Sequence, residues 1–181
     1  MNLETYQRGL QRLVTQGQAA PEDAAYLQQL AGCTQLAVVR EIVYFWRAHG
    51  LERFCILSAS LLKSLGRFEN AIERFVSTEK FSPFIEEASQ QFLQFLTKDQ
   101  NSIVAALAKT EIALHETRTN ILTEIVVEWP CNPEPILLAI VNATLVNQLD
   151  INQELFTPES YRLRISRALA NGYACELVET L

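Results

Sequence analysis

Histidine and closely spaced cysteine are scarce in this chain of 181 residues. It contains two histidines and four cysteines. The cysteines Cys33, Cys55, Cys131 and Cys175 are far apart along the chain, and no Cys-x-x-Cys pair occurs. Zinc sites are normally built from clustered Cys and His ligands. The sequence therefore predicts no zinc site, and we interpret the thiols, including Cys131 between two prolines, as structural.

Recognisable catalytic motifs are also missing. There is no glycine-rich phosphate loop, no His-Glu-x-x-His pair and no strand-elbow serine motif. Glu111 and His115 are four residues apart, a spacing that suits a metal pair or a plain intrahelical contact. An enzyme with an unrecognised site at this pair is one alternative. We expect no catalytic, cofactor-binding or metal-binding residue in the chain.

Long apolar runs are absent as well. No segment reaches the roughly 20 apolar residues that span a bilayer, and the first residues, "MNLETYQRGLQRL", lack an apolar signal core. We therefore expect a cytoplasmic protein that does not bind membranes. Because 49% of the residues are hydrophobic, we also expect a folded globule.

An excess of positive charge is missing too, since the net charge is −6. Residues 81–160 alone carry three Lys or Arg against eleven Asp or Glu, whereas residues 161–181 carry three against two. Phosphate binding relies on a basic surface. The sequence therefore predicts no nucleic-acid partner. The nine Phe, two Trp and five Tyr recur mostly at helical spacing, and we expect most of them in the core.

Helical periodicity dominates the first 118 residues and predicts six or seven helices. Pro21 is expected to open the second helix, and Gly50 to end the third, with His49 at its end. Residues 51–66 then form a separate helix. The last long helix is expected to start at Asn101 or Ser102.

A period of two replaces this pattern after residue 120. "ILTEIVVEW" (121–129) alternates apolar and polar residues, which predicts a half-buried strand, and the three prolines that follow must end it. An apolar helix is expected from Pro133 or Pro135, and "YRLRISRA" and "YACELVET" are expected to pair as a hairpin. The fold class is thus mainly α with a small α+β tail: a helical body over residues 1–119 and a tail over 120–181 that ends in a short antiparallel sheet.

The C-terminal hairpin is the candidate peptide-binding surface. An extended peptide can add to an unpaired strand edge, and Arg162 and Arg164 on one face would suit an acidic peptide. The alternative is that the hairpin only covers the helical core. The candidate peptide-binding residues are Tyr161, Arg162, Arg164, Ser166 and Tyr173.

Five motifs in succession carry a family resemblance. They are "REIVYFWRAHGLERF", "LLKSLGRFENAIERFV", "FIEEASQQFLQFL", "LAKTEIALHETR" and "VVEWPCNPEPILLAI". Together they resemble the small helical proteins once catalogued as DNA-binding domains, among them the methanobactin-biosynthesis partner proteins (the MbnC family). Some members of this family are partners of multinuclear iron enzymes that modify ribosomally made peptides.

The resemblance implies a non-catalytic subunit of a heterodimer with an MbnB-like iron oxidase. Such a subunit would bind the leader of a precursor peptide while the oxidase converts core cysteines to oxazolone and thioamide groups of a copper-chelating peptide. It implies that the iron belongs to the partner subunit and that this chain holds no cofactor. A DNA-binding transcriptional regulator, as the older family label suggests, is the other alternative.

Overall fold

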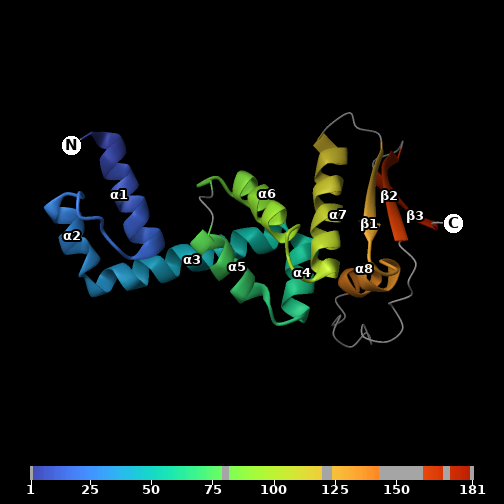
Figure 1. Cartoon of the computed structure of the whole chain (residues 1–181), viewed down its shortest axis with the longest axis horizontal. Coiled ribbons are helices and arrows are strands. Elements are labelled where there is room, and N and C mark those ends of the chain that lie inside the picture. Colours follow the sequence, from blue (N-terminus) through green and yellow to red (C-terminus); the bar gives the residue numbers. More distant parts are fainter. Residues whose placement is uncertain (1, 79–81, 120–123, 143–160, 169–171, 180–181) are drawn as a thin grey trace.

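A computed structural model describes residues 2–78, 82–119, 124–142, 161–168 and 172–179. The molecule is elongated, with the N-terminal helices at one end and a small sheet at the other (Figure 1). The elements are α1 (Leu3–Gln16), α2 (Ala25–Ala31), α3 (Thr34–Phe54), α4 (Ile56–Ser64), α5 (Phe68–Thr78), α6 (Ile85–Leu96), α7 (Ser102–Thr119), β1 (Glu124–Trp129), α8 (Glu134–Val141), β2 (Tyr161–Ala168) and β3 (Gly172–Glu179). This architecture, mainly helical with a short antiparallel sheet near the C-terminus, confirms the predicted fold class.

Helix α1 packs on α2 and on α3, and this N-terminal part projects from the rest of the molecule (Figure 1). The prediction that Pro21 opens α2 is wrong, because the helix begins at Ala25. Pro21 lies instead in a turn that Asp23 closes, with its carboxylate accepting from the amide of Ala20 at 2.6 Å. Arg12 of α1 lies 3.3 Å from the same carboxylate, so one buried acid ties the turn to α1.

The third helix runs past Gly50, so the predicted helix end at that residue is wrong. Gly50 instead allows close helix packing: a Cβ there would lie 2.5 Å from Cδ1 of Ile85 in α6. Helix α3 ends before Cys55, and α4 begins at Ile56. His49 consequently lies inside α3 rather than at its end.

Helices α5, α6 and α7 complete the helical body. Helix α7 begins at Ser102, one of the two predicted starts. Asn101 caps it, because its side-chain oxygen accepts from the amides of Ile103 at 3.0 Å and Val104 at 3.2 Å. Phe75 of α5 and Phe92 of α6 meet edge to face, with ring centroids 5.2 Å apart. Helix α7 packs against α6 and α4.

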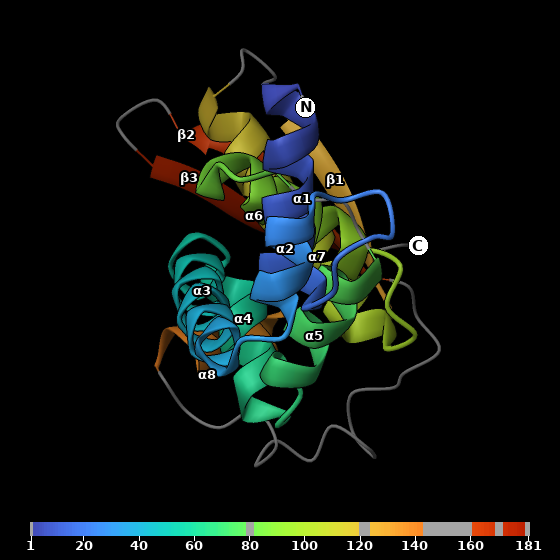
Figure 2. The same ribbon diagram turned by 90° about the vertical axis from the view of Figure 1, so that its left-hand side faces the viewer.

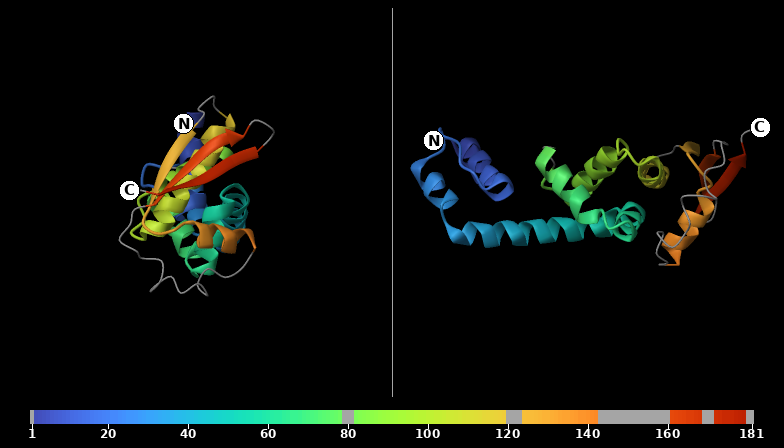
Figure 3. Two further views of the ribbon diagram at one scale, coloured as in Figure 1. Left: turned by 90° about the vertical axis from the view of Figure 1, so that its right-hand side faces the viewer. Right: turned by 60° about the horizontal axis from the view of Figure 1, so that its bottom comes forward.

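The sheet has the strand order β1-β2-β3, and both pairings are antiparallel. Glu124 pairs with Ser166 at one end of the β1–β2 register and Trp129 with Tyr161 at the other. Figure 3 (left) shows the three strands side by side in front of the helical body. The predicted strand is confirmed for its described residues, and its expected residues 121–123 lie outside them.

The buried core is continuous from α3 to β2. It includes Val127 and Trp129 of β1, Leu163 and Ile165 of β2, and the inner side chains of α4 to α8. The indole nitrogen of Trp129 donates to Thr110 of α7 at 3.1 Å. The proposed partition at residue 119 stays a prediction, but the core itself crosses it without a break.

Candidate functional site

The outer face of the sheet carries a ladder of ion pairs. Arg162 lies 3.9 Å from Glu128, and Arg164 lies 3.2 Å from Glu124 and 3.8 Å from Glu176. All five side chains are substantially exposed. Opposite charges across neighbouring strands favour one register, although each exposed pair stabilises the fold by only about 0.2–1 kcal/mol.

The expected basic face is therefore not what the structure shows. Three glutamates surround Arg162 and Arg164, so the outer face has mixed charge with a small acidic excess. The physical reason is the β1–β2 register, which places Glu128 directly opposite Arg162 and Glu124 diagonally opposite Arg164. Charge counted along residues 161–181 misses these neighbours from residues 124–128.

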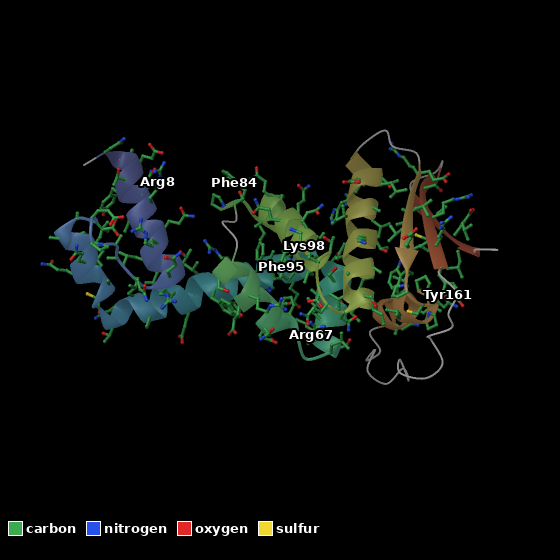
Figure 4. All side chains as sticks on the ribbon, viewed as in Figure 1. Arg8, Arg67, Phe84, Phe95, Lys98 and Tyr161 are labelled. Atoms are coloured by element: carbon green, nitrogen blue, oxygen red, sulfur yellow. The ribbon has the colours of Figure 1, made fainter. Side chains whose placement is uncertain are left out.

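The five candidate residues do not share one face. Arg162, Arg164 and Ser166 lie on the outer face, whereas Tyr161 packs against the core at the end of the sheet beside α8 (Figure 4). The backbone of Tyr173 in β3 pairs with Arg167 of β2. The side chain of Tyr173 lies outside the described residues.

The inner face of the sheet is only partly covered. Helix α7 packs on β1 and β2 and buries Val127, Leu163 and Ile165. In β3, Leu177 pairs with Leu163 and Cys175 pairs with Ile165, so both point to this same inner face. Yet Leu177 is 37% exposed and Cys175 is exposed. The apolar inner side of β3 thus extends beyond the helical layer.

The outer edge of β3 has no neighbouring strand within the described parts of the chain. The backbone groups on this edge can bond to an added strand. An added strand would also meet Leu177 and Cys175 laterally, since they lie on the uncovered inner side. We call this surface, made of the free edge of β3 with Cys175 and Leu177, the β3 edge.

A concave surface lies between α1, α3 and α5. It is a groove of about 780 Å³, and its lining includes Arg40, Tyr44 and Arg47 of α3 and Glu73 of α5. Tyr44 donates to the carbonyl of Glu69 at 3.3 Å, and burial, aided by two nearby glutamates, raises the pKa of its hydroxyl. The groove combines both charge signs with apolar walls.

Glu111 has a structural task that the sequence did not reveal. Its buried carboxylate accepts from the amides of Leu57 at 3.0 Å and Ser58 at 2.9 Å, which are free donors at the start of α4. Burial raises the pKa of Glu111, while those two hydrogen bonds and the nearby His115 lower it. Both carboxylate oxygens are thus occupied by α4, which weakens the enzyme alternative based on this pair.

The buried thiols do not have the surroundings of reactive ones. Cys55 and Cys131 are each 0% exposed, and burial raises the pKa of both thiols. A reactive thiolate instead needs a lowered pKa and solvent access. The position of Cys131 agrees with its interpretation as a structural residue. In the described residues, no cluster of three or more His, Cys, Asp or Glu side chains is placed to hold a metal ion.

Sequence reasoning missed an exposed apolar stripe on α3. Its largest members, Phe45 and Trp46, are 64% and 65% exposed, contrary to the general expectation that aromatic residues lie in the core. The signal available in the sequence was that α3 is apolar around much of its circumference, more than a single buried face requires. No helix among the described residues is both long and apolar enough to span a membrane.

Comparison with known proteins yields no relative. A scan against family models, a search of curated proteins and a search of solved structures each return no match for this chain.

Proposed function

We propose that the chain is a non-catalytic subunit that binds an extended peptide at the β3 edge. The observation that carries the proposal is the coincidence of a free strand edge with an uncovered apolar inner side on the same strand. Main-chain hydrogen bonds to such an edge give affinity, and side-chain contacts beside it set the register. The β1 edge is a weaker candidate, because α7 covers its inner side at Val127.

The peptide that fits the family resemblance is the leader of a ribosomally made precursor. In this proposal the chain works as an MbnC-like partner of an MbnB-like iron oxidase, which supplies the iron and converts core cysteines to oxazolone and thioamide groups. The chain contributes peptide binding and holds the complex together. Support for the oxidase comes from the succession of the five motifs, and support for peptide binding comes from the β3 edge.

Mixed charge on the outer face changes what the peptide should look like. Arg162 and Arg164 already have acidic neighbours, so an acidic peptide gains less from them than isolated arginines would give. We therefore propose that apolar side chains at alternate positions of the leader contact Leu177 and Cys175, and that charge contributes secondarily. The DNA-binding alternative gains no support from a face on which glutamates outnumber arginines.

The test compares two matched substitutions on the sheet. Leu177→Lys places a charge beside the β3 edge, whereas Val126→Lys places one on the outer face of β1, where Val126 is 47% exposed. Binding of a fluorescent leader peptide of the proposed precursor is measured by fluorescence anisotropy. We expect Leu177→Lys to weaken binding at least about tenfold, equivalent to about 1.4 kcal/mol. Val126→Lys should change it little.

Two outcomes would contradict the proposal. Equal affinities for wild type and Leu177→Lys, with circular dichroism showing an intact fold, would locate the peptide elsewhere. Stoichiometric iron or oxidase activity in the chain purified alone, or failure to co-purify with the proposed oxidase partner, would argue against a non-catalytic partner. Salt-sensitive duplex binding in a gel shift would favour the regulator instead.

A further inference from the structure

An exposed apolar stripe follows one face of α3. Val38, Val39, Ile42, Phe45 and Trp46 are between 44% and 65% exposed. Phe45 and Trp46 pack edge to face at 6.1 Å between ring centroids, and His49 stacks on Phe45 at 6.3 Å. The aromatic side chains thus form a connected surface on the helix. We call these five apolar residues, with Gln35 and His49 at their two ends, the α3 stripe.

The α3 stripe faces away from the rest of the molecule. The groove between α1 and α5 is lined by Arg40, Val43, Tyr44 and Arg47, which lie on the opposite side of α3. Figure 3 (right) shows α1, α5 and α6 on one side of α3, and the view along the molecule in Figure 2 shows α3 at its margin. A partner could therefore approach the stripe without displacing these helices.

The spacing of the stripe is that of a helix-pairing seam. Its central line separates successive residues alternately by three and four positions, as in the apolar seam of paired helices. The residues on this line are Gln35, Val38, Ile42, Phe45 and His49. Val39 and Trp46 each follow a member of the line and widen it.

The stripe also matches itself when the helix is reversed about Ile42. Val38 then faces Trp46, Val39 faces Phe45, and Gln35 faces His49. Every apolar position meets an apolar position, and the polar end residues meet each other. A two-fold symmetric interface requires this kind of self-complementarity. No member of the stripe is an acidic or basic residue other than His49, so two copies would not bring Lys, Arg, Asp or Glu of the stripe into contact.

We propose that the α3 stripe is the interface between two copies of this chain, packed as antiparallel α3 helices around Ile42. The stripe exposes on the order of 500 Å² of mainly apolar surface, near the upper end for the largest patch of a typical monomer. A stable interface buries about 800 Å² per partner, and the polar margins of α3 contribute to the remainder. This proposal does not rest on the proposed function; with it, two peptide-binding subunits would share one assembly.

The first test is the mass in solution of the full-length chain. Light scattering after size exclusion, over a hundredfold range of protein concentration, should show the mass rising from 20.5 kDa toward twice that value. Ile42→Glu sets two carboxylates against each other at the symmetry axis and should keep the chain monomeric. Leu138→Glu in α8 is the matched control, because Leu138 is 52% and Ile42 51% exposed. It should dimerise like the wild type.

A second test reports the orientation of the helices. In a background with Cys33→Ser and Cys175→Ser, which removes the exposed thiols, Gln35→Cys and His49→Cys are prepared separately and treated with a short bis-maleimide. In the antiparallel pair, equal residues lie about 21 Å apart at 1.5 Å per residue, so neither variant alone should cross-link. The mixture of both variants should give a covalent dimer.

Several outcomes would overturn the proposal. These are a wild-type chain that stays monomeric throughout the concentration range, an Ile42→Glu variant that dimerises normally, or cross-linking of either single variant alone. A monomer that binds the iron oxidase through the α3 stripe would refute pairing of two copies while leaving the proposed function intact. Loss of leader binding by Leu177→Lys with normal dimerisation would separate the two proposals in the other direction.

Discussion

Removing the carboxylate of Glu111 should destabilise the fold more than a typical point substitution. The side chain is 4% exposed and accepts two backbone N–H groups at the start of α4. In Glu111→Ala both donors lose their acceptor inside the protein. A buried donor without a partner costs about 1–3 kcal/mol, and a lost helix cap about 0.5–2 kcal/mol. The substitution also removes the unfavourable free energy of burying a carboxylate, which offsets part of this cost. We therefore expect the free energy of unfolding to fall by about 3 kcal/mol.

Urea unfolding followed by circular dichroism measures this loss. A change of about 3 kcal/mol corresponds to a melting temperature lowered by about 6–12 °C for a chain of this size. Lys109→Ala, at an exposed position of the same helix, is the control and should change stability by less than about 0.5 kcal/mol. A loss below about 1 kcal/mol in Glu111→Ala would refute the capping role.

The pH dependence of Glu111→Gln gives an independent check. Burial raises the pKa of Glu111 in the folded state above its value in the unfolded chain, which is about 4.3. At pH values between the unfolded-state and the folded-state pKa of Glu111, the folded protein therefore binds more protons than the unfolded chain. The contribution of Glu111 to stability falls as pH rises through this range. The stability difference between wild type and Glu111→Gln should thus shrink from pH 4 upward. A difference that grows with pH would contradict the sign of this shift.

Two further predictions concern the sheet and its support. Thr110→Val should lower the free energy of unfolding by about 1–3 kcal/mol, because the buried indole N–H of Trp129 loses its acceptor. Chemical denaturation measures the loss, and an unchanged stability would mean that the indole finds another partner. Arg164→Glu puts a third carboxylate beside the glutamates that flank it on β1 and β3, and should lower stability by about 1 kcal/mol, less at high salt. A loss that is independent of salt would show that packing rather than charge is responsible.

Local patterns were sufficient for most of the fold. The three-to-four spacing of apolar residues located the helices, and alternation located β1 and the β2–β3 hairpin. Each of these elements is encoded within its own segment. The end of α3 could not be found in the same way. Gly50 permits contact with Ile85, and the cap at α4 comes from Glu111, so distant residues decide where the helix breaks.

The candidate site was predicted only in outline. The hairpin and its arginines were found from sequence, but the neutralising glutamates depend on the β1–β2 register. The exposure of Leu177 depends on how far α7 reaches across the sheet, and no periodicity encodes that distance. The α3 stripe was hidden for a related reason: an apolar helix has the same sequence pattern whether its second face meets the core or another molecule.

The four cysteines divide the molecule into regions that can be followed separately. Cys33 begins the N-terminal arm of α3 and Cys175 lies on β3, both exposed, whereas Cys55 lies at the α3–α4 junction and Cys131 follows β1, both buried. A thiol reagent should therefore modify Cys33 in the native protein, and Cys175 more slowly because partial burial raises the pKa of its thiol. It should reach the inner two only when their surroundings open. Cys55 and Cys131 can therefore report local unfolding of the core, while Cys33 and Cys175 serve as references that react in the native protein.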